Sequence, residues 1–402
     1  MKLHYFNPGH ETAVSNASPY YTAPANVVAM QHELAFLPAW YADSADRILT
    51  DDSTDEYYTY LCEKLPSLPK PISADELGRL GNAEVSLWGI SPQVIYHFET
   101  LNKDLELKLK IPEWHREYTY LNGRQAARDC LMKLATSIPE LSQAIIPKFY
   151  TKLEDIYEAV NNSPCQLLAK APYSSSGRGL LWLPVTGLTR TENQILHGIL
   201  KKQGSISVEK VLDKYTDFAL EFMADGKGGI EFAGYSLFHT NPKGGYESNH
   251  IGSQEDIEAQ LSEKVGLSLI HRIKESLIAI LSATYAAYTG CIGVDMLVYK
   301  ENGEYKLHPC LEINMRYNMG FLTCRLYQNY ISPGSSGKFY LDFNSVTGEM
   351  YKNHLRMQYD YPPRFEKGKL LSGYLPLCPV NEESKYRAYI LIDKDSLQSF
   401  RT

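Results

Sequence analysis

Residues 291–316 read CIGVDMLVYKENGEYKLHPCLEINMR, and this stretch decides the fold of the chain. Asn302 and Gly303 separate two runs in which apolar and polar residues alternate, which predicts antiparallel strands joined by a two-residue turn. A symmetric turn brings every apolar residue of the first strand opposite an apolar residue of the second, so one face of the hairpin belongs to the core. The predicted pairs are Ile292–Ile313, Val294–Leu311, Met296–Pro309 and Val298–Leu307.

The other face of this hairpin carries Asp295 on the first strand and Glu312, Asn314 and Arg316 on the second. In the symmetric register Asp295 and Glu312 are diagonal neighbours, about 7–8 Å apart. Mg²⁺ prefers oxygen ligands at about 2.0–2.1 Å, so the two carboxylates and the amide of Asn314 can hold one or two ions that also bind phosphate groups. Each residue alone could lie on a solvated strand face, but the shared face favours a metal site.

Composition restricts the class of protein. The chain has 402 residues, of which 44% are hydrophobic and 22% charged, as expected for two or three globular domains. A net charge of −7 argues against a nucleic-acid or membrane surface, and no apolar run approaches the length of a membrane span. The amino terminus lacks a secretion leader and the seven cysteines form no CxxC pair, so we expect a cytoplasmic protein with reduced thiols.

A glycine-rich loop joins two short apolar runs near residue 175. Small residues let backbone N–H groups approach an anion closely, so the loop predicts a flap over phosphate groups, although a flexible turn has the same composition. Lys170 ends the strand that precedes the loop, and Lys148 lies one strand earlier; we expect both cations to point toward one side of a small sheet. The flap residues are Ser174, Ser175, Ser176, Gly177, Arg178 and Gly179.

Residues 205–212 predict a strand that leads out of this small sheet. Its exposed backbone could bind an adenine edge, and Glu209 or Asp213 could accept hydrogen bonds from a ribose, although a structural strand with a solvated Glu-Lys pair is the simpler interpretation of this segment by itself. We name this group the hinge segment. Its predicted ligand-binding residues are Glu209, Lys210, Leu212 and Asp213.

Two further segments leave alternatives open. The first strand ends in the turn Asn7-Pro8-Gly9-His10-Glu11, which is either a ligand-binding turn at the end of an α/β strand or ordinary turn chemistry. Arg124 and Arg128 lie four residues apart on a predicted helix, and we expect both on the surface.

Taken in order, these features resemble the ATP-grasp superfamily. The resemblance covers about residues 120–325, and its most specific part is the Glu-x-Asn-x-Arg pattern that begins at Glu312 and follows an acidic residue on the neighbouring strand. Asp295 stands where Glu is the commoner residue. The implied fold class is α/β (α+β), with an N-terminal α/β domain before a two-lobed ATP-grasp fold. The expected domains are 1–120, a small lobe 121–204 with the flap, a large lobe 205–330 with the hairpin, and a β-rich appendage 331–402.

The resemblance also implies cofactors and roles. The expected cofactors are ATP and Mg²⁺ or Mn²⁺. Lys148 and Lys170 would contact phosphates under the flap, the hinge segment would hold adenosine, and Asp295, Glu312 and Asn314 would ligate the metal. Lys170 and Arg316 would be the catalytic cations, with Arg316 facing the acyl substrate or its phosphate.

The expected activity is that of an ATP-dependent ligase, which joins a small carboxylic acid to an amine through an acyl phosphate. The acid is an amino acid, a peptide or another small carboxylate, and the expected assembly is a homodimer. Two other functions remain open: a small-molecule kinase with the same fold, and a nucleotide-binding protein without turnover.

Overall fold

The structure is a computed structural model that describes residues 1–174 and 177–393. Contacts within the chain define two units. The first unit comprises residues 1–115 and 247–257 together with the described residues from 316 onward, and the second comprises 116–246 and 258–315. Within the described residues, no helix combines the length and apolar composition that crossing a membrane requires.

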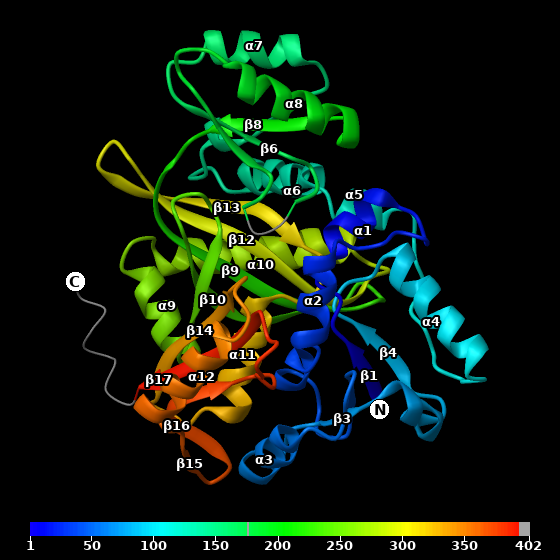
Figure 1. Ribbon diagram of the computed structural model, residues 1–402. Helices are drawn as coiled ribbons and strands as arrows, with labels where there is room; N and C mark the ends of the chain where they lie inside the picture. Colours follow the sequence, from blue (N-terminus) through cyan, green and yellow to red (C-terminus); the bar gives the residue numbers. More distant parts are fainter. Residues whose placement is uncertain (175–176, 394–402) are drawn as a thin grey trace. The chain divides into compact units, whose positions relative to one another are not determined.

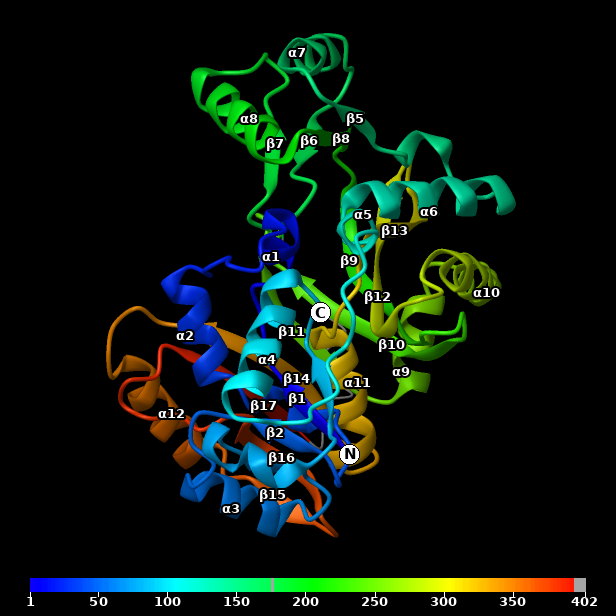
Figure 2. The same cartoon turned by 90° about the vertical axis from the view of Figure 1, so that its right-hand side faces the viewer.

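The first unit opens with a four-stranded parallel sheet in the order β3-β2-β1-β4, as expected for the N-terminal α/β domain. Figure 2 shows α4 beside this sheet. The strands are β1 (Lys2–Tyr5), β2 (Arg47–Leu49), β3 (Lys70–Ile72) and β4 (Glu84–Leu87). The helices are α1 (His10–Asn16), α2 (Ala25–Glu33), η1 (Leu37–Trp40), α3 (Glu56–Lys64), η2 (Ala74–Leu80) and α4 (Pro92–Asp104).

The carboxy-terminal part of the first unit is rich in antiparallel strands, which run in the order β14-β17-β16-β15, with β11 paired to β14. The strands are β11 (Tyr246–Ile251), β14 (Ser336–Phe343), β15 (Arg364–Glu366), β16 (Lys369–Pro376) and β17 (Tyr386–Asp393). The helices are α11 (Met319–Tyr330) and α12 (Glu349–Asp360).

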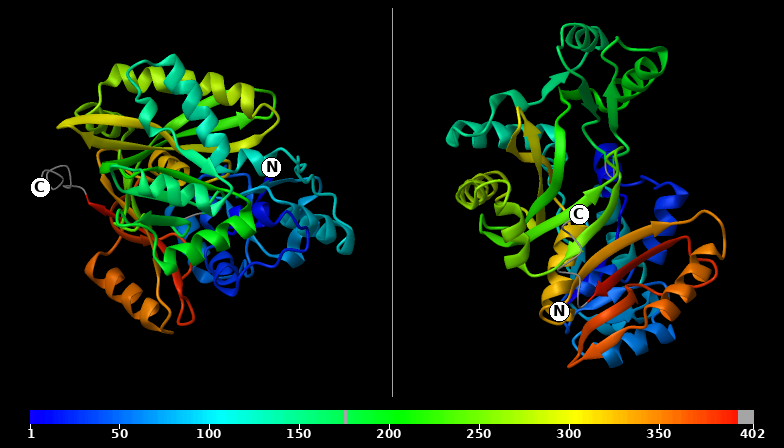
Figure 3. Two further views of the ribbon diagram at one scale, coloured as in Figure 1. Left: turned by 90° about the horizontal axis from the view of Figure 1, so that it is seen from above. Right: turned by 90° about the vertical axis from the view of Figure 1, so that its left-hand side faces the viewer.

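The second unit contains a small antiparallel sheet in the order β5-β8-β6-β7. Two helices, α7 and α8, cover one of its faces (Figures 1 and 3). Ile156 of α7 and Leu196 of α8 pack there against Ala169, Val208 and other buried side chains. The elements are β5 (Lys148–Tyr150), α7 (Leu153–Asn161), β6 (Leu167–Lys170), β7 (Leu180–Leu183), α8 (Arg190–Gln203) and β8 (Ile206–Lys210).

The second unit also contains a larger antiparallel set of strands in the order β13-β12-β9-β10. Helix α10 buries an apolar stripe of four residues three or four positions apart, from Ile270 to Leu281, as the helical spacing predicts. The strands are β9 (Asp213–Asp225), β10 (Ile230–Thr240), β12 (Thr289–Glu301) and β13 (Glu304–Asn314). The remaining helices are α5 (Tyr118–Leu121), α6 (Arg124–Ser137), η3 (Gln143–Ile145), α10 (Leu267–Thr284) and α9 (Gln254–Ser262), which crosses the boundary between the units.

The predicted hairpin forms with its turn at Asn302 and Gly303, both of which have positive φ. The symmetric register holds next to the turn, where Val298 lies opposite Leu307 as predicted. It changes farther along because β13 carries three residues, Pro309 to Leu311, where β12 carries only Met296. Pro309 has no N–H to donate to the ladder, which is consistent with an irregularity at this point.

Beyond Leu297, the irregularity makes the observed pairing of residues differ from the predicted pairing. Val294 lies opposite Ile313 and not opposite Leu311, and the predicted pairs Ile292–Ile313 and Met296–Pro309 are wrong for the same reason. The shift is by two residues, so each side chain keeps the face that the alternation predicted.

Candidate active site

The acidic residues of the hairpin lie closer together than the sequence predicted. Asp295 is directly opposite Glu312, and Asn314 is directly opposite Gly293 on the same face. The prediction that Asp295 and Glu312 are diagonal neighbours is wrong; directly opposed residues have Cβ atoms about 4.5–5.5 Å apart. Two opposed carboxylates with an amide one pair further on form a set of hard oxygen donors that suits a divalent cation.

A third carboxylate, which the sequence pattern did not lead us to expect, lies on the same face. Glu221 of β9 is opposite Gly293, so Glu221 and Asn314 flank a residue without a side chain. Glu221 is buried, and the thiol of Cys291 lies 3.9 Å from its Oε2. The signal that could have indicated it is a single carboxylate within an otherwise apolar run, residues 218–224. No three His, Cys, Asp or Glu side chains in the described part of the chain form a metal cluster by themselves. A metal here would therefore need further ligands, such as phosphate oxygens.

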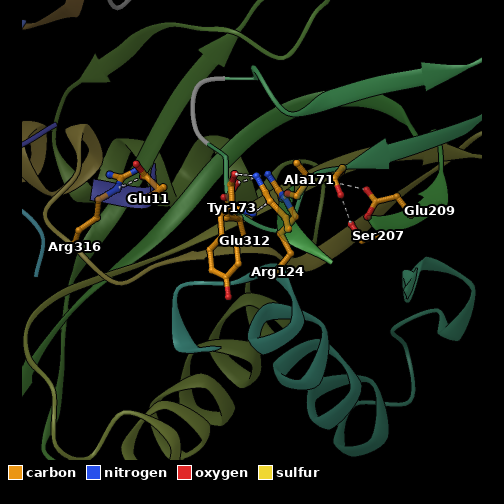
Figure 4. A network of polar contacts seen from close by, with 10 residues as sticks. Glu11, Arg124, Ala171, Tyr173, Ser207, Glu209, Glu312 and Arg316 are labelled. Carbon is orange, nitrogen blue, oxygen red and sulfur yellow. Dashed lines mark hydrogen bonds and ion pairs between the residues drawn. The ribbon is translucent and has the colours of Figure 1, made fainter. Parts of the chain in front are cut away.

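Arg124 joins this face from the first turn of α6. Its Nη2 donates to Oε2 of Glu312 at 3.1 Å, and its Nε donates to the carbonyl oxygen of Ala171 at 3.1 Å (Figure 4). The Arg124 side chain is 9% exposed and that of Glu312 27% exposed. The expectation that Arg124 lies on the surface is therefore wrong. Arg128 is partly exposed and stacks on the ring of Phe149.

Lys170 forms the second buried ion pair of this region. Its Nζ lies 2.5 Å from Oε1 of Glu209, with side chains that are 7% and 11% exposed. The sheet register explains the pair, because Lys170 is opposite Ser207 on β8 and Glu209 is the next residue on that face. The carbonyl oxygen of Ala171 accepts a hydrogen bond from Arg124, and Ala171 directly follows Lys170 in the chain. Both buried cations therefore lie close to the residue at which the flap begins.

Lys148 does not share the face of Lys170. It pairs with Val208, whereas Lys170 pairs with Ser207, and neighbouring residues of a strand point to opposite faces. Lys148 is also exposed. The prediction that the two lysines point toward one side of the sheet is wrong, because β5 joins the sheet in a register that the sequence does not specify.

Ser175 and Ser176 of the predicted flap lie outside the described residues. At the base of the flap, the N–H of Ala171 donates to the carbonyl of Gly179 at 2.9 Å. Gly177 has φ of +74°, and a Cβ at this position would lie 2.6 Å from the carbonyl oxygen of Gly244 in the loop between β10 and β11. Gly177 therefore lies against a second glycine-containing loop, and only glycine permits this approach.

In the hinge segment, the side chain of Lys210 pairs with Glu301 at 2.8 Å. The N–H of the next residue, Val211, donates to the carbonyl of Gln166 at 3.0 Å, so this donor is already used within the sheet. Leu212 lies between β8 and β9, and Asp213 begins β9 and is exposed.

Arg316 belongs to the first unit, where its Nε donates to Oε1 of Glu11 at 2.5 Å (Figure 4). Burial is the largest influence on the pKa of Glu11 and acts to raise it, but the charges of Arg316 and His10 and the hydrogen bonds to the carboxylate together outweigh burial, so the pKa is lowered. The turn from Asn7 to Glu11 also binds Gly89, through both the amide nitrogen and the amide oxygen of Asn7. These contacts give the turn a role that neither alternative named, because its last residue, Glu11, orients the side chain of Arg316.

Several solved structures resemble this chain in architecture. Biotin carboxylase from Campylobacter jejuni, in complex with βγ-ATP, has a TM-score of 0.51 at 10% identity over 98% of this chain and 87% of that chain. The biotin carboxylase domain of the 2-oxoglutarate carboxylase from Hydrogenobacter thermophilus has a TM-score of 0.51 at 11% identity, over 98% and 86%. This chain has the ATP-grasp fold.

A third structure with the ATP-grasp fold is the ADP complex of N5-carboxyaminoimidazole ribonucleotide synthetase, with a TM-score of 0.50 at 10% identity over 98% of this chain and 93% of that chain. No protein-family model matches the sequence, and no curated protein is significantly similar to it. The likeness at 10–11% identity concerns the fold, so the function must be argued from the residues of the site.

Proposed function

We propose that the protein is an ATP- and Mg²⁺-dependent ligase that joins a small carboxylic acid to an amine through an acyl phosphate. The observation that carries the proposal is the direct opposition of Asp295 and Glu312, with Arg124 bound to one of these carboxylates. A metal–triphosphate complex carries both positive and negative charge. The two carboxylates of this face suit the metal, and the buried cation suits phosphate oxygens that the metal does not neutralise. The ATP complex of one structure with this fold supports the choice of nucleotide.

In this proposal the buried cations Arg124 and Lys170 contact the phosphates, and Arg124 takes the place that our sequence analysis assigned to Lys148. Asp295, Glu312 and Asn314 would hold Mg²⁺ or Mn²⁺, which would supply positive charge to the phosphate groups. The flap closes over the phosphates, and Glu209 with the hinge segment holds the adenosine. Arg316, oriented by Glu11, faces the acyl group.

The reaction follows from the poor electrophilicity of a carboxylate. An oxygen of the acid attacks the γ-phosphorus of ATP, ADP leaves, and an acyl phosphate results. The amine then attacks the carbonyl carbon, and inorganic phosphate leaves as the amide forms. Arg124 and Lys170 meet charge that develops on the phosphate oxygens, so the chain contributes positioning and electrostatic stabilisation and needs no nucleophile of its own.

ADP formation by the full-length protein tests this function. Amino acids and other small carboxylates would be screened in pairs with amines, in the presence of ATP and Mg²⁺. We expect ADP and inorganic phosphate to form in equal amounts, and only when both an acid and an amine are present. A stable phosphorylated product without phosphate release would instead establish a kinase, and nucleotide binding without ADP formation in any pair would favour a binding protein.

The contact between Gly177 and Gly244 yields a prediction about the flap. We expect Gly177→Ala to lower kcat/KM for ATP at least about tenfold, because the new methyl group would press on the carbonyl of Gly244 and displace the flap. Gly204→Ala is the matched control, since Gly204 has φ of +78° with nothing within 4 Å. Both variants should lose about 1 kcal/mol of folding free energy from the left-handed backbone. Equal activity of the two variants would contradict a functional role for the contact.

A further inference from the structure

His308 of β13 is a buried polar side chain that the roles above do not use. It is 2% exposed. Among the residues that the structure describes, neither ring nitrogen of His308 has a hydrogen-bond partner. Buried polar groups in native proteins are nearly always hydrogen-bonded, so a histidine with two unsatisfied nitrogens in the interior calls for a specific explanation.

The sheet register places His308 on the face of the candidate metal ligands. His308 is directly opposite Leu297, and the next pair on the same face is Asp295 with Glu312. Two residues of a strand span about 7 Å, which is too far for His308 to share a metal with these carboxylates. It is a suitable distance for contact with another part of a ligand whose phosphates lie at Asp295 and Glu312.

The charged groups around His308 are those of the proposed nucleotide site. Burial lowers the pKa of His308 to about 4, with opposing effects from Glu209, which raises it, and Lys170, which lowers it. The backbone of Ile145 also raises the pKa, although it does not reach hydrogen-bond geometry with the ring. The imidazole is therefore neutral at pH 7 and offers one donor and one acceptor.

We propose that His308 contacts the base of the bound nucleotide and accepts a hydrogen bond from the 6-amino group of adenine. This inference rests on the proposed function and deepens it, because it names a residue that recognises the base. A neutral imidazole suits a base better than a phosphate, which would favour a cation. Leu297, the buried partner of His308 across the strands, supplies apolar surface of the kind that lines base pockets, where a few polar atoms fix the orientation.

A comparison of two nucleotides with two proteins tests this contact. Affinities of the full-length protein for ATP and for purine riboside 5′-triphosphate, which lacks the 6-amino group, would be measured by calorimetry with Mg²⁺. We expect the wild-type protein to prefer ATP by about tenfold, the scale of one buried hydrogen bond. In His308→Phe the preference should fall below about twofold, through weaker binding of ATP, while the purine nucleotide binds as before.

Two further variants make the result specific. His308→Gln keeps an acceptor and should retain part of the preference for ATP, whereas His197→Phe changes an exposed histidine of α8 and should have no effect. If His308→Phe does not fold, as thermal unfolding would show, His308→Leu provides the same comparison. An unchanged preference in the folded variant would overturn the assignment of His308 alone. A wild-type protein that binds neither nucleotide would overturn the proposed function as well.

Discussion

Glu312→Gln is expected to reduce kcat for ADP formation at least about a hundredfold, because it removes the charge of one of two opposed carboxylates at the proposed metal site. Gln keeps the shape of the side chain and one oxygen that can accept from Arg124, so the fold should remain intact. We expect a loss of about 1–3 kcal/mol in the free energy of unfolding, the cost of weakening a hydrogen bond to a buried charge. Steady-state kinetics at several Mg²⁺ concentrations and thermal unfolding would measure the two effects.

The control for this variant is Glu304→Gln, which removes the same charge from an exposed position next to the turn of the same hairpin. It should leave both kcat and stability unchanged, because Glu304 lies far along the strands from Asp295. Wild-type turnover in Glu312→Gln would remove the metal assignment.

Arg124→Met is expected to lower kcat/KM for ATP at least about a hundredfold, whereas Lys148→Met should stay within about threefold of the wild type. The reason is the geometry of the two cations. Arg124 is buried, holds Glu312 and binds the carbonyl next to Lys170, whereas Lys148 is exposed on the other face of the small sheet. A buried cation that already binds the metal-binding strand is positioned to stabilise charge on phosphate oxygens.

Kinetics with ATP as the varied substrate and thermal unfolding would be measured for both variants. Arg124→Met should also lower the free energy of unfolding by about 3 kcal/mol, because it leaves Glu312 without its charged partner in a mostly buried position. Arg124→Lys, which keeps the charge but cannot reach two acceptors at once, should be intermediate in activity. A fall in kcat/KM for Lys148→Met as large as that for Arg124→Met would show that the face assignment does not decide which cation binds ATP.

The face of each hairpin residue was predictable, and the pairing of residues across the hairpin was not. Alternation between apolar and polar residues is a local property, and it placed Asp295, Glu312 and Asn314 on one face correctly. The pairing of Asp295 with Glu312 depends on how β13 accommodates Pro309, which is a property of the ladder between two strands. A shift of two residues preserves every face and still changes which side chains meet.

The cations of the site also show that local sequence patterns do not predict which residues meet in the folded chain. Lys170 was identified because it adjoins a glycine-rich loop in the sequence. Arg124 was missed because a helical arginine has no sequence signature for burial. Lys148 was placed on the wrong face because the register of β5 against β8 joins segments almost 60 residues apart.

The sequence by itself determined the hairpin and the order of its acidic residues, because these follow from local periodicity and turn chemistry, and its resemblance to the ATP-grasp superfamily predicted the fold class. Only the tertiary structure decided which charges lie together: Asp295 with Glu312, Glu312 with Arg124, Lys170 with Glu209, and Arg316 with Glu11. A buried charge must find its partner wherever the fold places one, and in this protein three of these partners come from segments far away in the chain.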